Sequence, residues 1–335
     1  MKKPALFILM ITVLILAACG ADETDNSDST ADTSKIKVYT TVYPLTYFTE
    51  RIGGDFVDVT SVYPAGANEH TFEPTQQDMI AIAEADLMFY IGLGLEGFID
   101  SAKKTLEGED VEFTALADAI TDERLEEALH RDGEESHEDD HEHEDDHDES
   151  GHEEGHEGHN HGSTDPHIWM SPKLSQDLAD SIKESLIAKD SANAETYEAN
   201  HEALIKELQQ LDQSFSELHE QVSNDTFFVS HAAFTYLAEP YGFQQVAVAG
   251  LNSQDEPSQK ELTEIVELAR EKNIEYIVFE QNVSSNLTEV VQKEVGAEAV
   301  EMHNLGVLTQ ENIDNNETYF SLMQRNLEVL ETILQ

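Results

Sequence analysis

Short apolar runs recur along the chain, separated by helical or polar segments. In the first half these runs predict four strands, at residues 36–42, 56–62, 86–91 and 111–116. In the second half they predict four more, at residues 226–230, 243–248, 274–279 and 298–302. Strands that alternate with helices are typical of parallel sheets covered by helices on both faces. The pattern therefore predicts two successive β/α arrays.

Helical patterns lie between several of these runs. Residues 193–222 carry an apolar stripe at helical spacing and predict one long helix between the arrays. A closing helix is predicted from about residue 316 to residue 333. Three further helix starts have capping residues, namely Thr75 with Asp78, Ser171 with Pro172, and Ser258 with Glu261.

These elements predict an α/β protein of two lobes joined by one long helix. Each lobe is expected to hold a small parallel sheet flanked by helices. The boundaries place the N-terminal lobe at residues 35–192, the linking helix at 193–222 and the C-terminal lobe at 223–335. Open parallel sheets bind ligands at the carboxyl ends of their strands. We therefore look for functional side chains just after the predicted strands.

The N-terminus predicts an exported, lipid-anchored protein. Lys2 and Lys3 precede a twelve-residue apolar run, which is too short to span a bilayer because spanning needs ~20 residues. The run ends at Leu16-Ala-Ala-Cys19, which resembles the bacterial lipobox, so residues 1–19 are interpreted as a lipoprotein signal peptide with Cys19 lipidated. An ordinary signal peptide with an incidental cysteine is the alternative. The polar residues 20–34 are expected to form a flexible tether.

Net charge and cysteine content limit the partners and the kinds of metal site that the protein can have. The chain has 70 acidic against 18 basic residues, a formal net charge of −52, which disfavours nucleic acid and anionic lipid as partners. The same charge attracts cations, but it also suits saline surroundings and does not by itself show metal handling. A single cysteine excludes an intrachain disulfide and a tetrathiolate zinc site. Any metal site must therefore use His, Asp and Glu.

One segment, residues 130–164, interrupts the β/α pattern. It is built mainly from His, Asp, Glu and Gly, with no apolar side chains, and we interpret it as an insertion that is disordered without metal. Three stretches in it match H-E-x-x-H, but that protease signature needs a stable helix, which this composition does not support. A solvated loop with no role is the plain alternative to a weak, exchangeable zinc trap. The trap would use His137, His141, His143, His147, His152, His156, His159 and His161.

Six histidines lie in sequence that is expected to be ordered. Two of them, His201 and His219, fall on the long helix and are interpreted as surface residues, and His303 follows the last strand without a supporting motif. The other three follow strands or lie in Pro-containing loops, as does one acidic residue. They are His70, His167, His231 and Glu280. Three imidazoles and a carboxylate form a donor set suited to Zn²⁺.

Four stretches of this sequence resemble the zinc and manganese solute-binding proteins of ABC importers. They are Asn68-Glu-His-Thr-Phe-Glu-Pro74, Asp165-Pro-His-Ile-Trp169, Ser230-His-Ala-Ala-Phe234 and Phe279-Glu-Gln-Asn-Val-Ser-Ser285. They occur in the family's order, and the resemblance covers residues 36–335. It implies a cleft between two lobes, where the family binds its metal ion.

The resemblance also implies a ligand set. The residues matching His70, His167 and His231 bind the metal in that family, and the match to Glu280 completes the shell. In some zinc members the acid before the first histidine, here Glu69, or a water takes the fourth position. Asp165 is expected to accept a hydrogen bond from an imidazole and orient it.

The third histidine favours zinc as the cargo. Manganese members generally have a carboxylate where this chain has His231, and nitrogen donors suit Zn²⁺ better than Mn²⁺. The expected protein is therefore a monomeric, extracytoplasmic zinc receptor, held at the membrane through Cys19, that delivers Zn²⁺ to an ABC permease. A closed four-ligand site argues against an enzyme, because catalysis needs an open metal position. A manganese or iron receptor of the same family, and a zinc buffer or adhesin, are the alternatives.

Overall fold

A computed structural model describes residues 35–129, 164–283 and 285–335. The predicted signal peptide, the predicted lipidation site Cys19 and the predicted tether lie outside these residues. The eight histidines proposed as a weak zinc trap lie outside them too. All described residues belong to one compact unit. The division of the chain at residues 192 and 223 stays a prediction.

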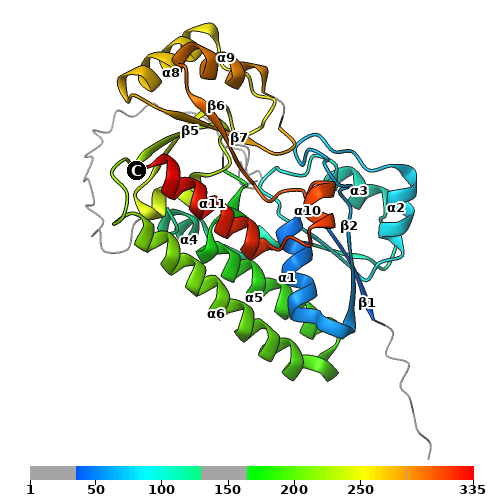
Figure 1. Ribbon diagram of the computed structural model, residues 1–335. Coiled ribbons are helices and arrows are strands. Elements are labelled where there is room, and N and C mark those ends of the chain that lie inside the picture. The colour runs from blue at the N-terminus through cyan, green and yellow to red at the C-terminus, as the bar shows by residue number, and fades with distance from the viewer. Residues whose placement is uncertain (1–34, 130–163, 284) are drawn as a thin grey trace, which may run out of the picture. The chain divides into compact units, whose positions relative to one another are not determined.

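Within the described residues, eight strands form two parallel sheets of four, and each strand overlaps a run predicted from the sequence (Figure 1). The first sheet contains β1 (Ile36–Thr40), β2 (Val57–Ser61), β3 (Leu87–Tyr90) and β4 (Glu112–Ala115). The second contains β5 (Thr226–His231), β6 (Gln244–Ala249), β7 (Tyr276–Glu280) and β8 (Glu298–Met302). The predicted two-lobed α/β class is therefore confirmed.

The two sheets repeat one topology. Their strand orders are β2-β1-β3-β4 and β6-β5-β7-β8, and every neighbouring pair is parallel. The chain therefore changes direction across each sheet between its first and third strands, β1 and β3 or β5 and β7. In open parallel sheets the crevice at such a switch point is where ligands bind, at the carboxyl ends of the strands. In the second sheet, this point lies between the ends of β5 and β7.

Helices connect and cover the strands. In the first half they are α1 (Tyr43–Gly53), α2 (Gln76–Ala83), α3 (Ile99–Thr105), α4 (Asp122–Glu127) and α5 (Pro172–Lys189). Then come α6 (Ala194–Leu218), α7 (Thr235–Ala238), α8 (Gln259–Glu271), α9 (Asn286–Val295), α10 (Gln310–Asp314) and α11 (Tyr319–Ile333). Short 3₁₀ turns occupy Gly54–Phe56, Leu116–Ala119, Ile168–Met170, Ser191–Asn193 and Glu239–Tyr241.

The predicted caps explain where three of these helices begin. Thr75 and Asp78 form a capping box at α2, Ser258 and Glu261 form another at α8, and Ser171 caps α5. Helix α1 was not predicted. Its first turn contains Pro44, and proline is favoured there because the N–H that it lacks would have no partner inside the helix.

Helix α6 is the long helix that the apolar stripe predicts. It packs beside α5, as Figure 1 shows, and buries the residues of that stripe. The interpretation of His201 as a surface residue is wrong. Its side chain is buried against α5, with Nε2 3.2 Å from Oδ1 of Asp180. The histidine lies on the packed face because it is one turn from Tyr197 and from Leu204.

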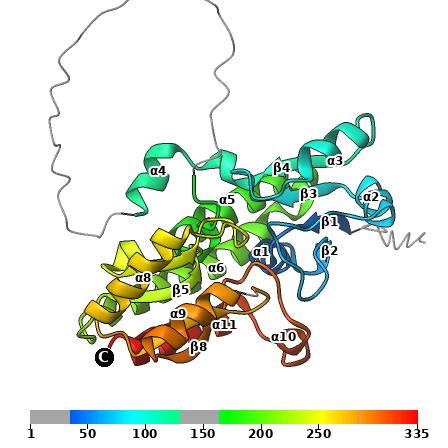
Figure 2. The same cartoon turned by 90° about the horizontal axis from the view of Figure 1, so that it is seen from above.

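The hydrophobic core is continuous through most of the described chain. One cluster joins the first sheet, α1, α5, α6, α11 and one face of the second sheet. A smaller cluster packs α8 and α9 on the other face of the second sheet, and Figures 1 and 2 show these two helices together there. Among the described residues, no helix has the length and apolar content needed to cross a membrane.

Candidate metal centre

His70 lies in the loop that follows β2. The loop is shaped by Asn68, whose Oδ1 accepts the backbone N–H of His70 at 3.0 Å and whose Nδ2 donates to Oγ of Ser253 at 2.9 Å. This turn between Asn68 and His70 is local, whereas Ser253 belongs to the second half of the chain. The loop therefore contacts both halves of the molecule. His70 is half-buried near the middle of this loop.

His167 is held by an aspartate two residues earlier. Oδ1 of Asp165 accepts the backbone N–H of His167 at 2.9 Å and lies 2.7 Å from its Nδ1. The imidazole is completely buried. Because Nδ1 donates to the carboxylate, Nε2 carries the lone pair that a metal ion needs. Asp165 therefore contacts the ring nitrogen opposite Nε2, and its orienting role at a metal site stays a prediction.

His231 is the last residue of β5, and Glu280 is the last residue of β7. Because β5 and β7 are neighbours, their ends meet, and Nδ1 of His231 lies 2.8 Å from Oε1 and 2.7 Å from Oε2 of Glu280. Oε1 also accepts the backbone N–H of His231 at 3.0 Å and the hydroxyl of Ser230 at 2.7 Å. Both side chains are fully buried. The carboxylate therefore fixes the imidazole with Nε2 on the opposite side.

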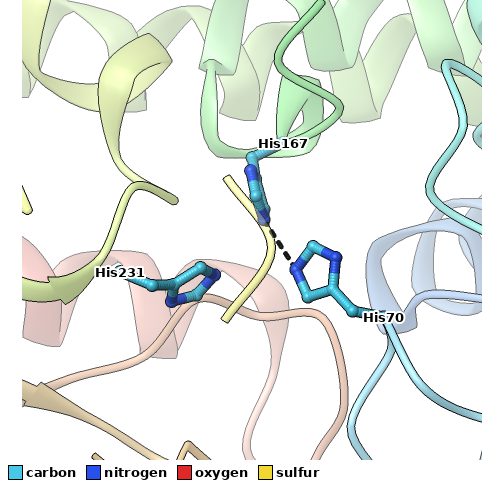
Figure 3. A group of neighbouring side chains, drawn as sticks. All are labelled: His70, His167 and His231. Carbon is cyan, nitrogen blue, oxygen red and sulfur yellow. Dashed lines mark hydrogen bonds between the residues drawn. The ribbon is translucent and has the colours of Figure 1, made fainter. Parts of the chain in front are cut away.

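The three imidazoles converge on one point (Figure 3). One ring nitrogen from each of His70, His167 and His231 lies within 4.8 Å of the others. Nε2 of His70 and Nε2 of His167 are 3.3 Å apart. Two nitrogens bound to one Zn²⁺ at ~2.0–2.1 Å in tetrahedral geometry are also about 3.3 Å apart. This pair therefore already has the spacing of two zinc ligands.

Burial and neighbouring charges shift the pKa values of His70, His231 and Glu280 in different directions. Burial lowers the pKa of His70 to about 3, with a further contribution from the two neighbouring imidazoles. Burial also disfavours the charged form of His231, but the charge and hydrogen bond of Glu280 outweigh it and raise the pKa of His231. For Glu280, burial raises the pKa, but the charge and hydrogen bond of His231 outweigh it and the net shift is downward. His70 is therefore neutral and ready to bind, while His231 must release a proton in mildly acidic solution.

The donor chemistry fits a zinc ion. Nε2 of His231 is buried and has no hydrogen-bond partner among the described residues. A buried polar atom left unpaired in this way is costly, so its presence indicates a ligand that completes it. Three neutral imidazole nitrogens are donors that Zn²⁺ accepts readily. The cluster is the one group of three or more potential metal ligands found in the described part of the chain.

The fourth ligand stays a prediction, and the structure shows where the two acids named for it lie. The carboxylate of Glu280 contacts Nδ1 of His231, and Oε1 of Glu69 accepts a hydrogen bond from Nδ2 of Asn304 at 3.0 Å. Neither acid is among the grouped donor atoms. The cause at Glu280 is the parallel pairing of β5 and β7, which brings its carboxylate to the outer side of the imidazole. As a fourth ligand, Glu280 would have to change its contact with His231.

Asn304 is the residue near the site that sequence reasoning missed. It follows β8, contacts both buried acids and accepts a hydrogen bond from Nε1 of Trp169 through its backbone oxygen. Its position just after a strand was the available signal, but an asparagine in a loop has no metal-ligand character. His303 and His219 stay outside the cluster. His303 bonds to Asn312, and the ring of His219 packs near Phe243.

The fold and the converging imidazoles define a two-lobed α/β protein with a candidate metal centre at its strand ends. A family model described as "Zinc-uptake complex component A periplasmic" matches residues 38–333. The chain therefore belongs to this zinc-uptake component family, named ZnuA.

Known relatives cover nearly the whole chain. The zinc-binding lipoprotein AdcA of Streptococcus pneumoniae is 34% identical over 333 residues, which are 98% of this chain and 60% of AdcA. The high-affinity zinc uptake system protein ZnuA of Bacillus subtilis is 34% identical over 334 residues, covering 99% of this chain and 98% of the relative. The chain thus spans about 60% of the length of AdcA and nearly all of the Bacillus protein.

A solved structure has the same architecture. The Zn(II)-bound ZnuA-like domain of AdcA from S. pneumoniae aligns with a TM-score of 0.67 and 30% sequence identity. The alignment covers 90% of this chain and 99% of that domain.

Proposed function

We propose that the protein captures Zn²⁺ outside the cytoplasmic membrane and delivers it to an ABC permease for import. The observation that carries this proposal is the convergence of His70, His167 and His231 on one point. The names of the relatives support zinc as the cargo and an uptake system as the partner. In this proposal the protein binds and releases the ion and does not catalyse a reaction.

The ion would be bound by three Nε2 atoms, with Asp165 and Glu280 orienting two of the rings from outside. Such outer partners raise ligand basicity and fix the ring nitrogen that faces the metal. The fourth position would be filled by water, by Glu280 after it leaves His231, or by Glu69 after it leaves Asn304. Imidazole donors favour Zn²⁺ over Mn²⁺, which prefers oxygen ligands.

The anchoring part of the proposal concerns residues that the structure does not describe. The lipobox-like sequence at Cys19 and the lipoprotein name of AdcA support attachment through a lipid. The His-rich insertion would supply additional weak zinc sites, and it ends three residues before His167 in the sequence. We expect the receptor to act as a monomer.

Metal binding and growth test this proposal separately. In competition titrations the protein should bind one tight Zn²⁺ and prefer it to Mn²⁺ and Fe²⁺. Deleting residues 130–164 should remove weak sites and keep the tight one. A cell lacking the protein should grow poorly when zinc is limiting. Stronger binding of Mn²⁺ would instead favour the manganese receptor, and normal zinc-limited growth would contradict the transport role.

A further inference from the structure

Asn304 uses each of its side-chain polar atoms and its backbone oxygen close to the candidate metal centre. It is 4% exposed. Its Nδ2 donates to Oε1 of Glu69 at 3.0 Å and to Oε2 of Glu280 at 3.2 Å. Its Oδ1 accepts the backbone N–H of Gly306 at 3.0 Å, and its backbone oxygen accepts Nε1–H of Trp169 at 2.7 Å. One residue therefore joins three segments that are far apart in the sequence.

Each of these segments carries a different imidazole of the cluster. Glu69 immediately precedes His70, Trp169 lies in the 3₁₀ turn that follows His167, and Glu280 binds Nδ1 of His231. The ring centroids of His167 and Trp169 are 5.3 Å apart, so the indole also contacts its imidazole directly. For each proposed ligand, Asn304 therefore bonds to a residue that adjoins or contacts that ligand, although it bonds to none of the three ligands itself.

The chemistry of the amide suits this position. A primary amide offers two N–H donors, so Nδ2 can bond to two carboxylates at once. Glu69 and Glu280 are both buried, and two carboxylates held close together in such surroundings repel each other unless a donor lies between them. The chain also approaches Glu69 closely at Gly306, where a Cβ atom would lie 2.6 Å from Oε1. Asn304 and the turn after it therefore enclose the Glu69 carboxylate.

We propose that Asn304 is a positioning residue that sets the spacing of the three imidazoles by tying their segments together through Glu69, Trp169 and Glu280. This inference rests on the proposed metal-binding function of the cluster. Without the amide, the two carboxylates lose their shared donor and separate, and the imidazoles that they adjoin move with them. Loss of an outer partner of metal ligands typically lowers metal affinity about 10- to 100-fold.

Two substitutions and one matched control test the proposal in the full-length protein. Asn304→Asp keeps the shape and the acceptor for Gly306 but replaces the bridging donor, whereas Asn304→Ala removes the whole side chain. The control is Asn326→Ala. Asn326 is 1% exposed, and within the described chain its amide bonds to the backbone N–H and the backbone oxygen of His303. It should therefore report the cost of losing a buried amide nearby.

The measurements are Zn²⁺ affinity by chelator competition, the visible absorption spectrum with Co²⁺ as a substitute ion, and thermal stability without metal. Both Asn304 variants should bind Zn²⁺ at least about 10-fold more weakly and show an altered Co²⁺ spectrum. Asn326→Ala should lose stability but keep the affinity within about twofold and the spectrum unchanged. The proposal is overturned if the Asn304 variants lose stability alone, or if the control loses as much affinity.

A double-mutant cycle tests the bridge itself. Glu69→Gln and Glu280→Gln should have non-additive effects on Zn²⁺ affinity when Asn304 is present, and additive effects in the Asn304→Ala background. Additive effects with Asn304 present would overturn the bridging role. If the unaltered protein bound no tight Zn²⁺, the proposed function itself would fail, which distinguishes that failure from the failure of this inference.

Discussion

The substitution Glu280→Gln separates two possible roles of this side chain. In the structure Oε1 accepts hydrogen bonds from Ser230 at 2.7 Å and from the backbone of His231 at 3.0 Å, and Nδ1 of His231 lies 2.8 Å away. Glutamine has the same shape but no charge. It can still accept a hydrogen bond from Nδ1, so the imidazole keeps its place while it loses its negative partner.

The expected decrease in Zn²⁺ affinity follows from the loss of the negative charge of Glu280. Removing an outer partner of a metal ligand lowers affinity about 10- to 100-fold, which corresponds to about 1.4 to 2.7 kcal/mol at 25 °C. The charge of Glu280 also raises the pKa of His231, so the variant should have a lower pKa at this imidazole. A raised histidine pKa makes a proton compete with Zn²⁺. The affinity of the unaltered protein should therefore begin to fall at a higher pH than that of the variant.

Chelator competition between pH 5 and pH 8 measures both effects, and X-ray absorption of the bound zinc reports its donor atoms. Glu96→Gln is the matched control, because Glu96 is similarly buried but bonds to Thr41 and to the backbone of Ile91 and Gly92. It should lower stability and leave affinity unchanged. An unchanged affinity and pH dependence in Glu280→Gln would refute the reasoning. A changed donor set would show that Glu280 is itself a ligand.

Three other predictions concern stability and local packing. Burial lowers the pKa of His70 to about 3 and that of His303 to about 4, so each of these imidazoles favours the unfolded chain as the pH falls below about 6.5. His303→Gln should therefore reduce the change in melting temperature of the metal-free protein between pH 7 and pH 5, and an unchanged difference would contradict this. Ser171→Ala should lower the free energy of unfolding in urea by about 1 kcal/mol because α5 loses its N-terminal cap, and an unchanged value would count against that role. Gly306→Ala should weaken Zn²⁺ binding because its Cβ would displace Glu69, and wild-type affinity would show that the turn simply moves aside.

Much of the fold was predictable because periodicity and caps are local signals. The strand β8 has the predicted limits, and the starts of α5 and α8 follow from their capping residues. Helix α1 was missed because its first turn contains Pro44, which fits both the end of a strand and the start of a helix. The burial of His201 was missed because one helix face packs on α5, which depends on tertiary contacts that the helical pattern alone does not show.

The site was predictable to a different degree at each residue. His231 could be placed because a strand ends there, and Asp165 because a carboxylate two residues before an imidazole reaches it easily. The orientation of Glu280 could not be inferred, since it depends on which edge of the imidazole faces the neighbouring strand. Apart from the bond to Gly306 in its own turn, every hydrogen bond of Asn304 goes to a residue more than 20 positions away. No local sequence pattern therefore indicates its contacts.

The central claim is that one tight zinc site is formed by His70, His167 and His231. Its most direct test is a competition titration of the full-length protein beside the variant in which all three are replaced by alanine. The account predicts one tight Zn²⁺ per chain in the unaltered protein, and only weak binding in the variant. If the variant still held one Zn²⁺ with the original affinity, the three imidazoles would not be the site.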